Sequence, residues 1–136
     1  MNAASINQAL KQYGTTRIGS EVDSASPHRL IQMLMEGAIE RIARARGAME
    51  RGDVGDKGKF IANAISIIEG LRASLDLNAG GDVAINLSNL YDYMSRRLLS
   101  SSIHNNVEML DEIASLMLEI KSGWDAISQM EAERVP

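Results

Sequence analysis

The sequence contains no cysteine, and it has only two prolines, one tryptophan and one phenylalanine in 136 residues. Without cysteine the chain can form neither a disulfide nor a cysteine-ligated zinc site, and nothing indicates a secreted scaffold. Aromatic residues make up 4% of the chain, which favours helices because strands draw on aromatic and β-branched residues. No apolar run approaches the roughly 18 residues of a membrane span, and the N-terminus lacks a signal-peptide pattern. We therefore expect an all-α protein of the cytosol, without membrane insertion.

The chain length and the net charge further limit which class of protein this can be. A chain of 136 residues is one domain by the usual size range and can bury a core without a stabilising metal. The net charge is −4, whereas a nucleic-acid-binding protein usually carries a basic patch. The densest basic stretch, residues 41–51, is interleaved with acidic residues at 40 and 50. We interpret it as a solvated helix face and expect no nucleic-acid partner.

Apolar residues recur at three- and four-residue steps in four long segments, which is the pattern of amphipathic helices. Ser26-Pro27 is a good N-cap followed by a first-turn proline, and Gly52 and Gly55 end the first segment. Residues 78–81 break the second segment, and Asp82 is a plausible cap for the third. The short breaks force successive helices to lie antiparallel. The sequence thus predicts an antiparallel four-helix bundle over residues 26–130, with helices at about 26–51, 56–77, 82–102 and 105–130.

The two ends of the chain are weakly patterned. In residues 1–25 a short helix is predicted, because Ile6, Leu10 and Tyr13 follow helical spacing and Gly14 follows as a stop. The rest of that segment is expected to be flexible. The apolar face of this helix is too short to fold alone, so we expect it to dock on the bundle, as a plug that a partner displaces. Residues 131–136 are predicted to be a disordered tail.

No constellation of catalytic or metal-binding residues is present. A di-iron bundle needs Glu-x-x-His pairs on its inner faces, and neither His28 nor His104 has a glutamate three residues before it. Ser26 lies close to His28, but its role as a cap accounts for it. Gly80-Gly81 is not followed by the Lys-Ser/Thr of a phosphate-binding loop. We expect no enzyme, no metal and no cofactor; a small metal-bearing or cofactor-bearing bundle enzyme is a minor alternative.

Some residues fall outside the apolar stripes. In NLYDYMSRRLL, residues 89–99, two tyrosines lie two positions apart, so they cannot face the same way on a helix. Tyr91 belongs with the core stripe, whereas Tyr93 lies about 110° from the stripe centre at 100° per residue. Gly70 interrupts a good helix interior, where it costs about 1 kcal/mol relative to alanine. One interpretation is edge packing; the other is that these helices offer grooves for the helices of a partner.

The order and spacing of these pieces resemble the flagellar secretion chaperones, the FliS family. The resemblance extends over roughly residues 13–124, and its strongest part is Leu90-Tyr-Asp-Tyr-Met94 with Arg96-Arg-Leu98. The other pieces are Tyr13, Ser24-Ala-Ser-Pro27, Leu30-Ile-Gln-Met-Leu34, Gly37-Ala38, Ala64-Ile-Ser-Ile-Ile68, Leu71, Leu75-Asp76, Gly80-Gly81 and Trp124. The sequence departs from the family pattern at Met35-Glu36, Ser101-Ser102 and Asn106, and the last two lie near a predicted loop.

The resemblance implies a cytosolic export chaperone. Such a protein binds the disordered C-terminal segment of flagellin, prevents premature polymerisation and assists delivery to the flagellar type III secretion apparatus. It implies contacts with export gate components and a segment around Tyr13 that takes part in or guards the client surface. The residues expected to bind the partner are Tyr13, Gly70, Leu71, Asn86, Asn89, Leu90, Tyr93 and Arg97. We expect a monomer or weak homodimer; the main alternative is a helical adaptor that binds another, folded protein.

Overall fold

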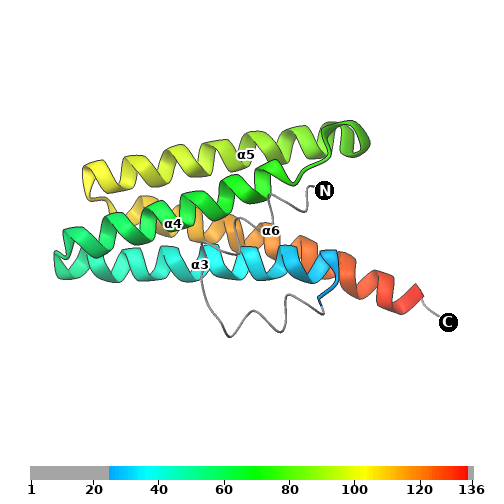
Figure 1. The fold of residues 1–136 in the computed structure, drawn as a ribbon, viewed down its shortest axis with the longest axis horizontal. Coiled ribbons are helices and arrows are strands. Elements are labelled where there is room, and N and C mark those ends of the chain that lie inside the picture. The colour runs from blue at the N-terminus through cyan, green and yellow to red at the C-terminus, as the bar shows by residue number, and fades with distance from the viewer. Residues whose placement is uncertain (1–24, 135–136) are drawn as a thin grey trace.

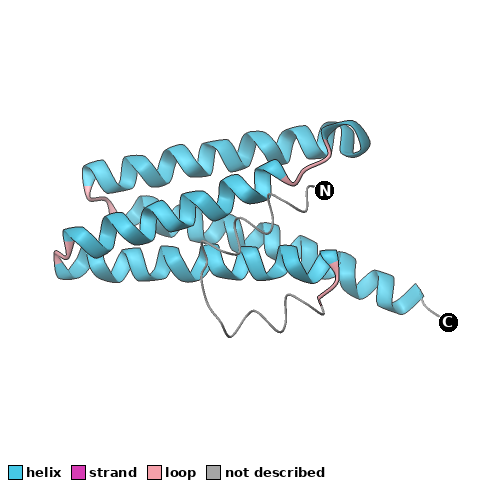
Figure 2. Cartoon of the chain, viewed as in Figure 1, coloured by secondary structure: helices cyan, strands magenta, loops and turns pink. Residues whose placement is uncertain are grey.

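The protein is built from helices alone over the residues that its computed structural model describes, 25–134, with side chains described through residue 127. The helices are α3 (Pro27–Arg51), α4 (Val54–Ala73), α5 (Leu77–His104) and α6 (Val107–Arg134), and Figures 1 and 2 show them side by side. Helix α3 packs on α4 and α6, and α5 packs on the same two helices. The links 52–53, 74–76 and 105–106 are too short for anything but antiparallel neighbours. The predicted all-α, antiparallel four-helix bundle is confirmed.

The boundaries of α3 follow the sequence prediction. The Ser26 hydroxyl oxygen accepts a hydrogen bond from the Arg29 amide at 3.2 Å, with Pro27 in the first turn. Gly52 ends the helix in the left-handed region at φ 73°, where glycine carries no Cβ penalty. Gly55 was expected to lie in the break and instead lies inside α4. The reason is local capping, because Asp53 accepts from the Asp56 amide at 3.0 Å and starts α4 early.

The start of α5 differs most from the prediction. Helix α4 ends at Ala73 rather than 77, and the chain becomes helical again at Leu77. Asp76 caps this turn by accepting from the Asn78 and Ala79 amides at 3.1 and 3.0 Å. The expected break over 78–81 with a cap at Asp82 was therefore wrong in extent, since an upstream aspartate caps first. The interruption is confined to Gly81, whose φ of 55° and ψ of −138° are not helical.

The last two helices run further than predicted. Helix α5 continues to His104 rather than 102 and ends at Asn105, which is left-handed at φ 53°. Helix α6 begins at Val107 rather than 105, because Asn106 caps it by accepting from the Met109 amide at 3.1 Å. It continues to Arg134 rather than 130. Residues 131–134, predicted as part of a disordered tail, are helical because Glu-Ala-Glu-Arg is made of good helix formers.

The core consists of the predicted apolar stripes. Tyr91 is 1% exposed and packs with Met94 and Leu98, as the spacing predicts. Val83 and Ile127 continue the apolar stripes of the third and fourth predicted helices, which predicts core positions, yet they are 77% and 46% exposed. Figure 1 shows why: the C-terminal part of α6 runs away from the start of α5, so the stripes lose their facing helix there. The predicted N-terminal helix, with Ile6, Leu10 and Tyr13, lies outside the described residues.

Candidate functional site

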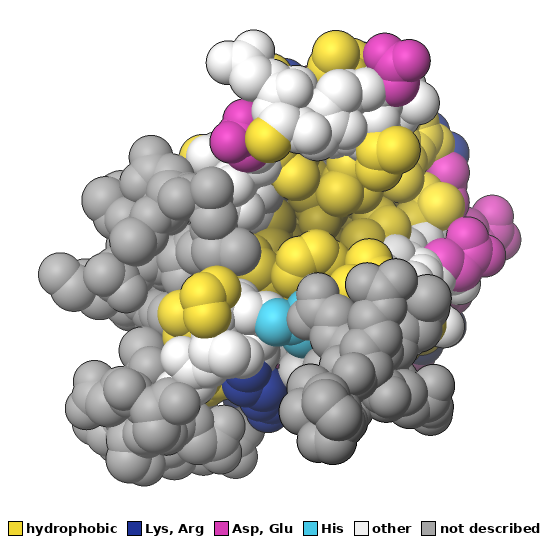
Figure 3. Space-filling view, turned by 90° about the vertical axis from the view of Figure 1, so that its right-hand side faces the viewer, with side chains coloured by type: hydrophobic (Ala, Val, Ile, Leu, Met, Phe, Trp, Pro, Cys, Tyr) yellow, Lys and Arg dark blue, Asp and Glu magenta, His cyan; other side chains and the backbone are white. Residues whose placement is uncertain are grey.

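The bundle is hollowed at the end where α3 begins and α4 ends. The hollow, which we call the end groove, has a volume of about 410 Å³, within the range of ligand-binding clefts. Figure 3 looks onto this end and shows apolar side chains gathered in the hollow. The lining residues are Ile31, Met35, Leu71, Ser74, Leu75, Asp76, Ala79, Gly80, Val83, Ala84, Leu87, Tyr91 and Trp124. A surface of this composition suits apolar side chains of another polypeptide better than a charged substrate.

The floor of the end groove is continuous with the core. Met35, Leu71 and Tyr91 line the groove and are each 1% exposed. Burial raises the pKa of the Tyr91 hydroxyl, so this group stays neutral at every physiological pH. The Ser74 hydroxyl is occupied, because it donates to the Leu71 carbonyl at 2.7 Å. The floor therefore offers apolar contact and no free charge.

The first turn of α5, residues 77–80, forms one wall of the end groove. Asp76, Ala79 and Gly80 all line it. A Cβ at Gly80 would come within 2.5 Å of the Ala84 Cβ, closer than real Cβ atoms approach, so this position needs glycine. Gly81 then turns the backbone at φ 55° and ψ −138°. Two adjacent glycines thus fix where this wall stands relative to the rest of α5.

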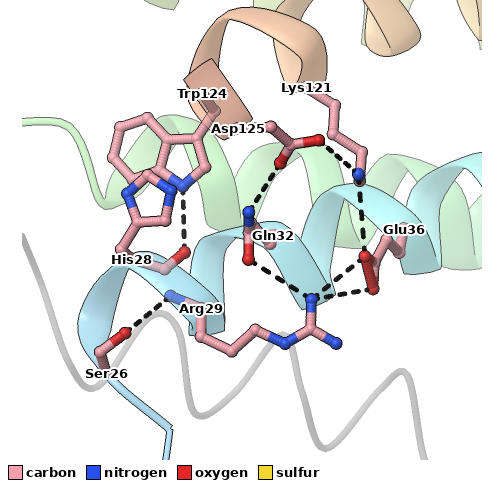
Figure 4. Close-up of polar contacts among 8 residues, drawn as sticks. All are labelled: Ser26, His28, Arg29, Gln32, Glu36, Lys121, Trp124 and Asp125. Carbon is pink, nitrogen blue, oxygen red and sulfur yellow. Dashed lines mark hydrogen bonds and ion pairs between the residues drawn. The ribbon is translucent and has the colours of Figure 1, made fainter. Parts of the chain in front are cut away.

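Trp124 of α6 forms the opposite wall and is held by α3 (Figure 4). Its indole Nε1 donates to the His28 carbonyl at 3.0 Å. The His28 and Trp124 rings stack with centroids 4.4 Å apart and planes 6° from parallel. The next residue, Asp125, accepts from Gln32 Nε2 and from Lys121 Nζ, each at 2.7 Å. The bonds from Lys121 and Gln32 hold the pKa of Asp125 below its usual value, so the carboxylate stays charged and the wall stays anchored.

Beyond the groove, a polar group joins α5 to α6. Glu112 accepts from the Tyr93 hydroxyl at 2.5 Å and from Arg97 Nε at 2.8 Å. The bond from Tyr93 is the largest cause that lowers the pKa of Glu112, and the bond from Arg97 is the next. The hydrogen bond between Tyr93 and Glu112 also raises the pKa of the Tyr93 hydroxyl. We call Tyr93, Arg97 and Glu112 the Glu112 cluster. It lies where the two helices are still in contact, whereas further along they separate.

The residues expected from the sequence to bind a partner lie at several different places in the structure. Leu71 lines the end groove. Leu90 is half-buried against the core, Tyr93 and Arg97 belong to the Glu112 cluster, and Asn86 and Asn89 are exposed on α5. Gly70 is half-buried beside Leu71, and Tyr13 lies outside the described residues. Leu71 thus lines the end groove, whereas Tyr93 and Arg97 lie beyond it in the Glu112 cluster.

Sequence reasoning missed most of the groove. Val83, Leu87 and Trp124 read as ordinary core positions because they continue the apolar stripes. The one available signal was the position of Val83, which follows Gly80-Gly81 after only one residue, Asp82. An apolar residue so close to the start of a helix has no guaranteed neighbour to cover it.

This fold and groove define a helical binding protein, since a bundle with an apolar groove suits the docking of an apolar helix. Within the described residues no helix is both long and apolar enough to cross a membrane. Nor do three or more metal-ligating side chains meet anywhere in residues 25–127.

Residues 8–131 match the family model described as flagellar protein FliS. The flagellar secretion chaperone FliSB of Pseudomonas aeruginosa is 52% identical over 121 residues, which cover 89% of this chain and 96% of that protein. The FliS chaperone of Salmonella typhimurium is 46% identical over 88% of this chain and 89% of its own. That of Bacillus subtilis is 30% identical over 82% and 83%. The chain belongs to the FliS family of flagellar secretion chaperones, and it is a chaperone and not an enzyme.

Proposed function

We propose that this chaperone acts in the cytosol and binds the disordered C-terminal segment of flagellin. It would prevent premature polymerisation and assist delivery to the flagellar type III secretion apparatus, where export gate components would compete for the client. The observation that supports this most is the end groove, an apolar hollow of about 410 Å³ whose floor is the bundle core. Family membership supports the flagellar client.

The physics of the groove suits a disordered client. Such a segment loses conformational entropy when it folds on binding, so it needs a large apolar contact for useful affinity. A preformed groove supplies that contact without an ordering cost of its own. Two walls of the groove are already in place in the free protein. Trp124 is held by α3 through the His28 carbonyl, and the α5 wall is set by the kink at Gly81. A client helix in the groove would have its apolar face covered, and that face would be withheld from filament assembly.

Two exposed residues of α5 give a matched test by calorimetry with a flagellin C-terminal peptide. Val83 lines the end groove and is 77% exposed, whereas Ile103 is 71% exposed at the other end of the same helix. Neither substitution removes a buried contact, so Val83→Asp and Ile103→Asp should both fold. Val83→Asp is expected to weaken peptide binding at least tenfold, and Ile103→Asp is expected to leave it within about twofold. If wild type shows no micromolar binding of this peptide, the chain has another client, as a helical adaptor would.

We also propose a role for Tyr93 and for the N-terminal segment. Tyr93 would border the client surface through its ring while its hydroxyl holds Glu112. Tyr93→Phe keeps the ring and should retain client affinity, whereas Tyr93→Ala should reduce it. Ile6, Leu10 and Tyr13 would act as a plug that the client displaces. Deletion of residues 1–14 should then change client affinity, and an unchanged affinity would refute the plug.

The assembly state is part of the same proposal. We expect the free chaperone to be a monomer or weak homodimer, since an uncovered apolar groove invites self-association. Sedimentation with and without the peptide tests this: bound peptide should abolish any concentration-dependent dimer.

A further inference from the structure

Helices α5 and α6 are in contact at the Glu112 cluster and separate toward the start of α5. Acidic side chains lie on both helices along this edge. Glu112 pairs with Arg97 across this edge at 2.8 Å. Glu119 lies seven residues, or two helical turns, further along α6 on the same face. Helix α5 runs antiparallel, so the position two turns from Arg97 is Leu90, which carries no charge. Glu119 therefore repeats the place of Glu112 but faces no cation.

The α5 side of the opening is also acidic. Asp76 lines the end groove and is exposed, and Asp82 is exposed directly after the Gly81 kink. Among residues 25–127, neither Asp82 nor Glu119 lies in any ion pair that we observe. Asp76 thus borders the end groove, and Asp82 and Glu119 are exposed carboxylates on α5 and α6, the two helices that separate there.

The cations of the surrounding helices are engaged elsewhere. Lys121 binds Asp125 at 2.7 Å, and Arg29 binds Glu36 at 3.2 Å. On α4 and α5, Arg72 and Arg96 both pair with Asp92, at 3.3 and 3.0 Å. Within the described residues no basic side chain is left to neutralise the opening, so its charge can be complemented from outside.

We propose, resting on the proposed function above, that the opening between α5 and α6 takes an amphipathic client helix with a cationic flank. The apolar face of that helix packs on Val83, Leu87 and Trp124. A lysine or arginine beside this face reaches Glu119 or Asp82, in the way that Arg97 reaches Glu112. The client helix thus continues the α5–α6 contact at the point where α6 leaves α5.

Two designed peptides test the charge separately from the groove. Both are tryptophan-free amphipathic helices of about 18 residues, or five turns, with the same leucine face. One carries lysines beside that face and the other glutamines. Because Trp124 is the only tryptophan and lines the groove, its fluorescence reports binding directly. At low salt the lysine peptide is expected to bind about three- to tenfold more tightly, as two exposed charge contacts allow. In 1 M salt the difference should disappear.

Matched variants complete the test. Asp82→Asn with Glu119→Gln should remove the preference for the lysine peptide. Glu108→Gln, an exposed glutamate in the first turn of α6, should leave it intact. Equal binding of the two peptides to wild type, or a preference that survives in the double variant, overturns the charge inference. If the flagellin tail binds but neither designed peptide does, this docking mode is wrong and the proposed function stands. If the tail and both peptides all fail to bind, both fall.

Discussion

Replacement of Gly81 by alanine tests whether the kink at the start of α5 sets the shape of the end groove. The residue has φ 55° and ψ −138°, a combination that residues with a Cβ adopt only under strain of about 1–3 kcal/mol. A Cβ built there meets no atom within 4 Å. The expected cost is therefore entirely in the backbone conformation and not in a collision.

The Gly81→Ala variant can respond to this strain in one of two ways, and both are measurable. If the kink is kept, Gly81→Ala should lower the free energy of unfolding by about 1–3 kcal/mol. That corresponds to a fall in Tm of roughly 3–5 °C per kcal/mol for a domain of this size. If the first turn of α5 moves instead, Asp76, Ala79 and Gly80 leave their places in the groove wall. Client affinity would then fall while stability changes less.

Urea denaturation followed by circular dichroism, with the slope m compared between variants, measures the first quantity, and peptide titration measures the second. Gly123→Ala is the control, because Gly123 is an exposed helical glycine whose added Cβ also meets nothing within 4 Å. It should stabilise the protein by up to about 1 kcal/mol, the opposite sign. Unchanged stability together with unchanged client affinity in Gly81→Ala would refute the role assigned to the kink.

Three further predictions concern side-chain bonds within and between the helices. Ser26→Ala removes the cap of α3 and should cost about 0.5–2 kcal/mol in thermal unfolding, with Ser26→Asp as the rescue. Trp124→Phe keeps an aromatic ring against His28 but loses the bond to its carbonyl, so about 0.5–1.5 kcal/mol should be lost; a loss of helical content would contradict the assignment. The pKa of Glu112 is lowered by Tyr93 and Arg97. Its carboxylate therefore stabilises the fold above an unfolded pKa of about 4.3, and that contribution disappears as pH falls through the folded pKa. The stability gap between wild type and Glu112→Gln in urea should be open at pH 7, narrow as the pH falls below the unfolded pKa, and close only below the lowered folded pKa.

Local signals in the sequence predicted the fold wherever one residue type decides a local conformation. Ser26, Pro27 and Gly52 fixed both ends of α3 because capping and left-handed geometry depend on a few neighbouring atoms. The same chemistry explains the errors. Asp53 and Asp76 are also good caps, and each starts its helix before the glycine that we expected to end the break. With several caps and glycines in one short stretch, the sequence does not say which one acts.

The groove was harder to predict because it is made of residues that look like core. Tyr91 and Val83 lie on one apolar stripe of α5, yet they are 1% and 77% exposed. Helical spacing tells which face of a helix is apolar, but it does not tell whether another helix covers that face. The cover depends on where α6 diverges from α5, a property of the whole bundle that Trp124, Gln32 and Asp125 help to fix.

The division between core and groove has an energetic consequence for the chaperone. At the Glu112 cluster α5 and α6 are joined by side-chain bonds, and beyond it the stripe of α5 stays buried at Tyr91 and Ala84 but is 77% exposed at Val83. A client helix in that place would bury surface that the free protein leaves open at Val83. Binding to the folded state alone raises stability by about 2.7 kcal/mol at a client concentration of 100 times Kd. The free chaperone lacks this contribution and depends on its own core, to which the buried floor of Met35, Leu71 and Tyr91 belongs.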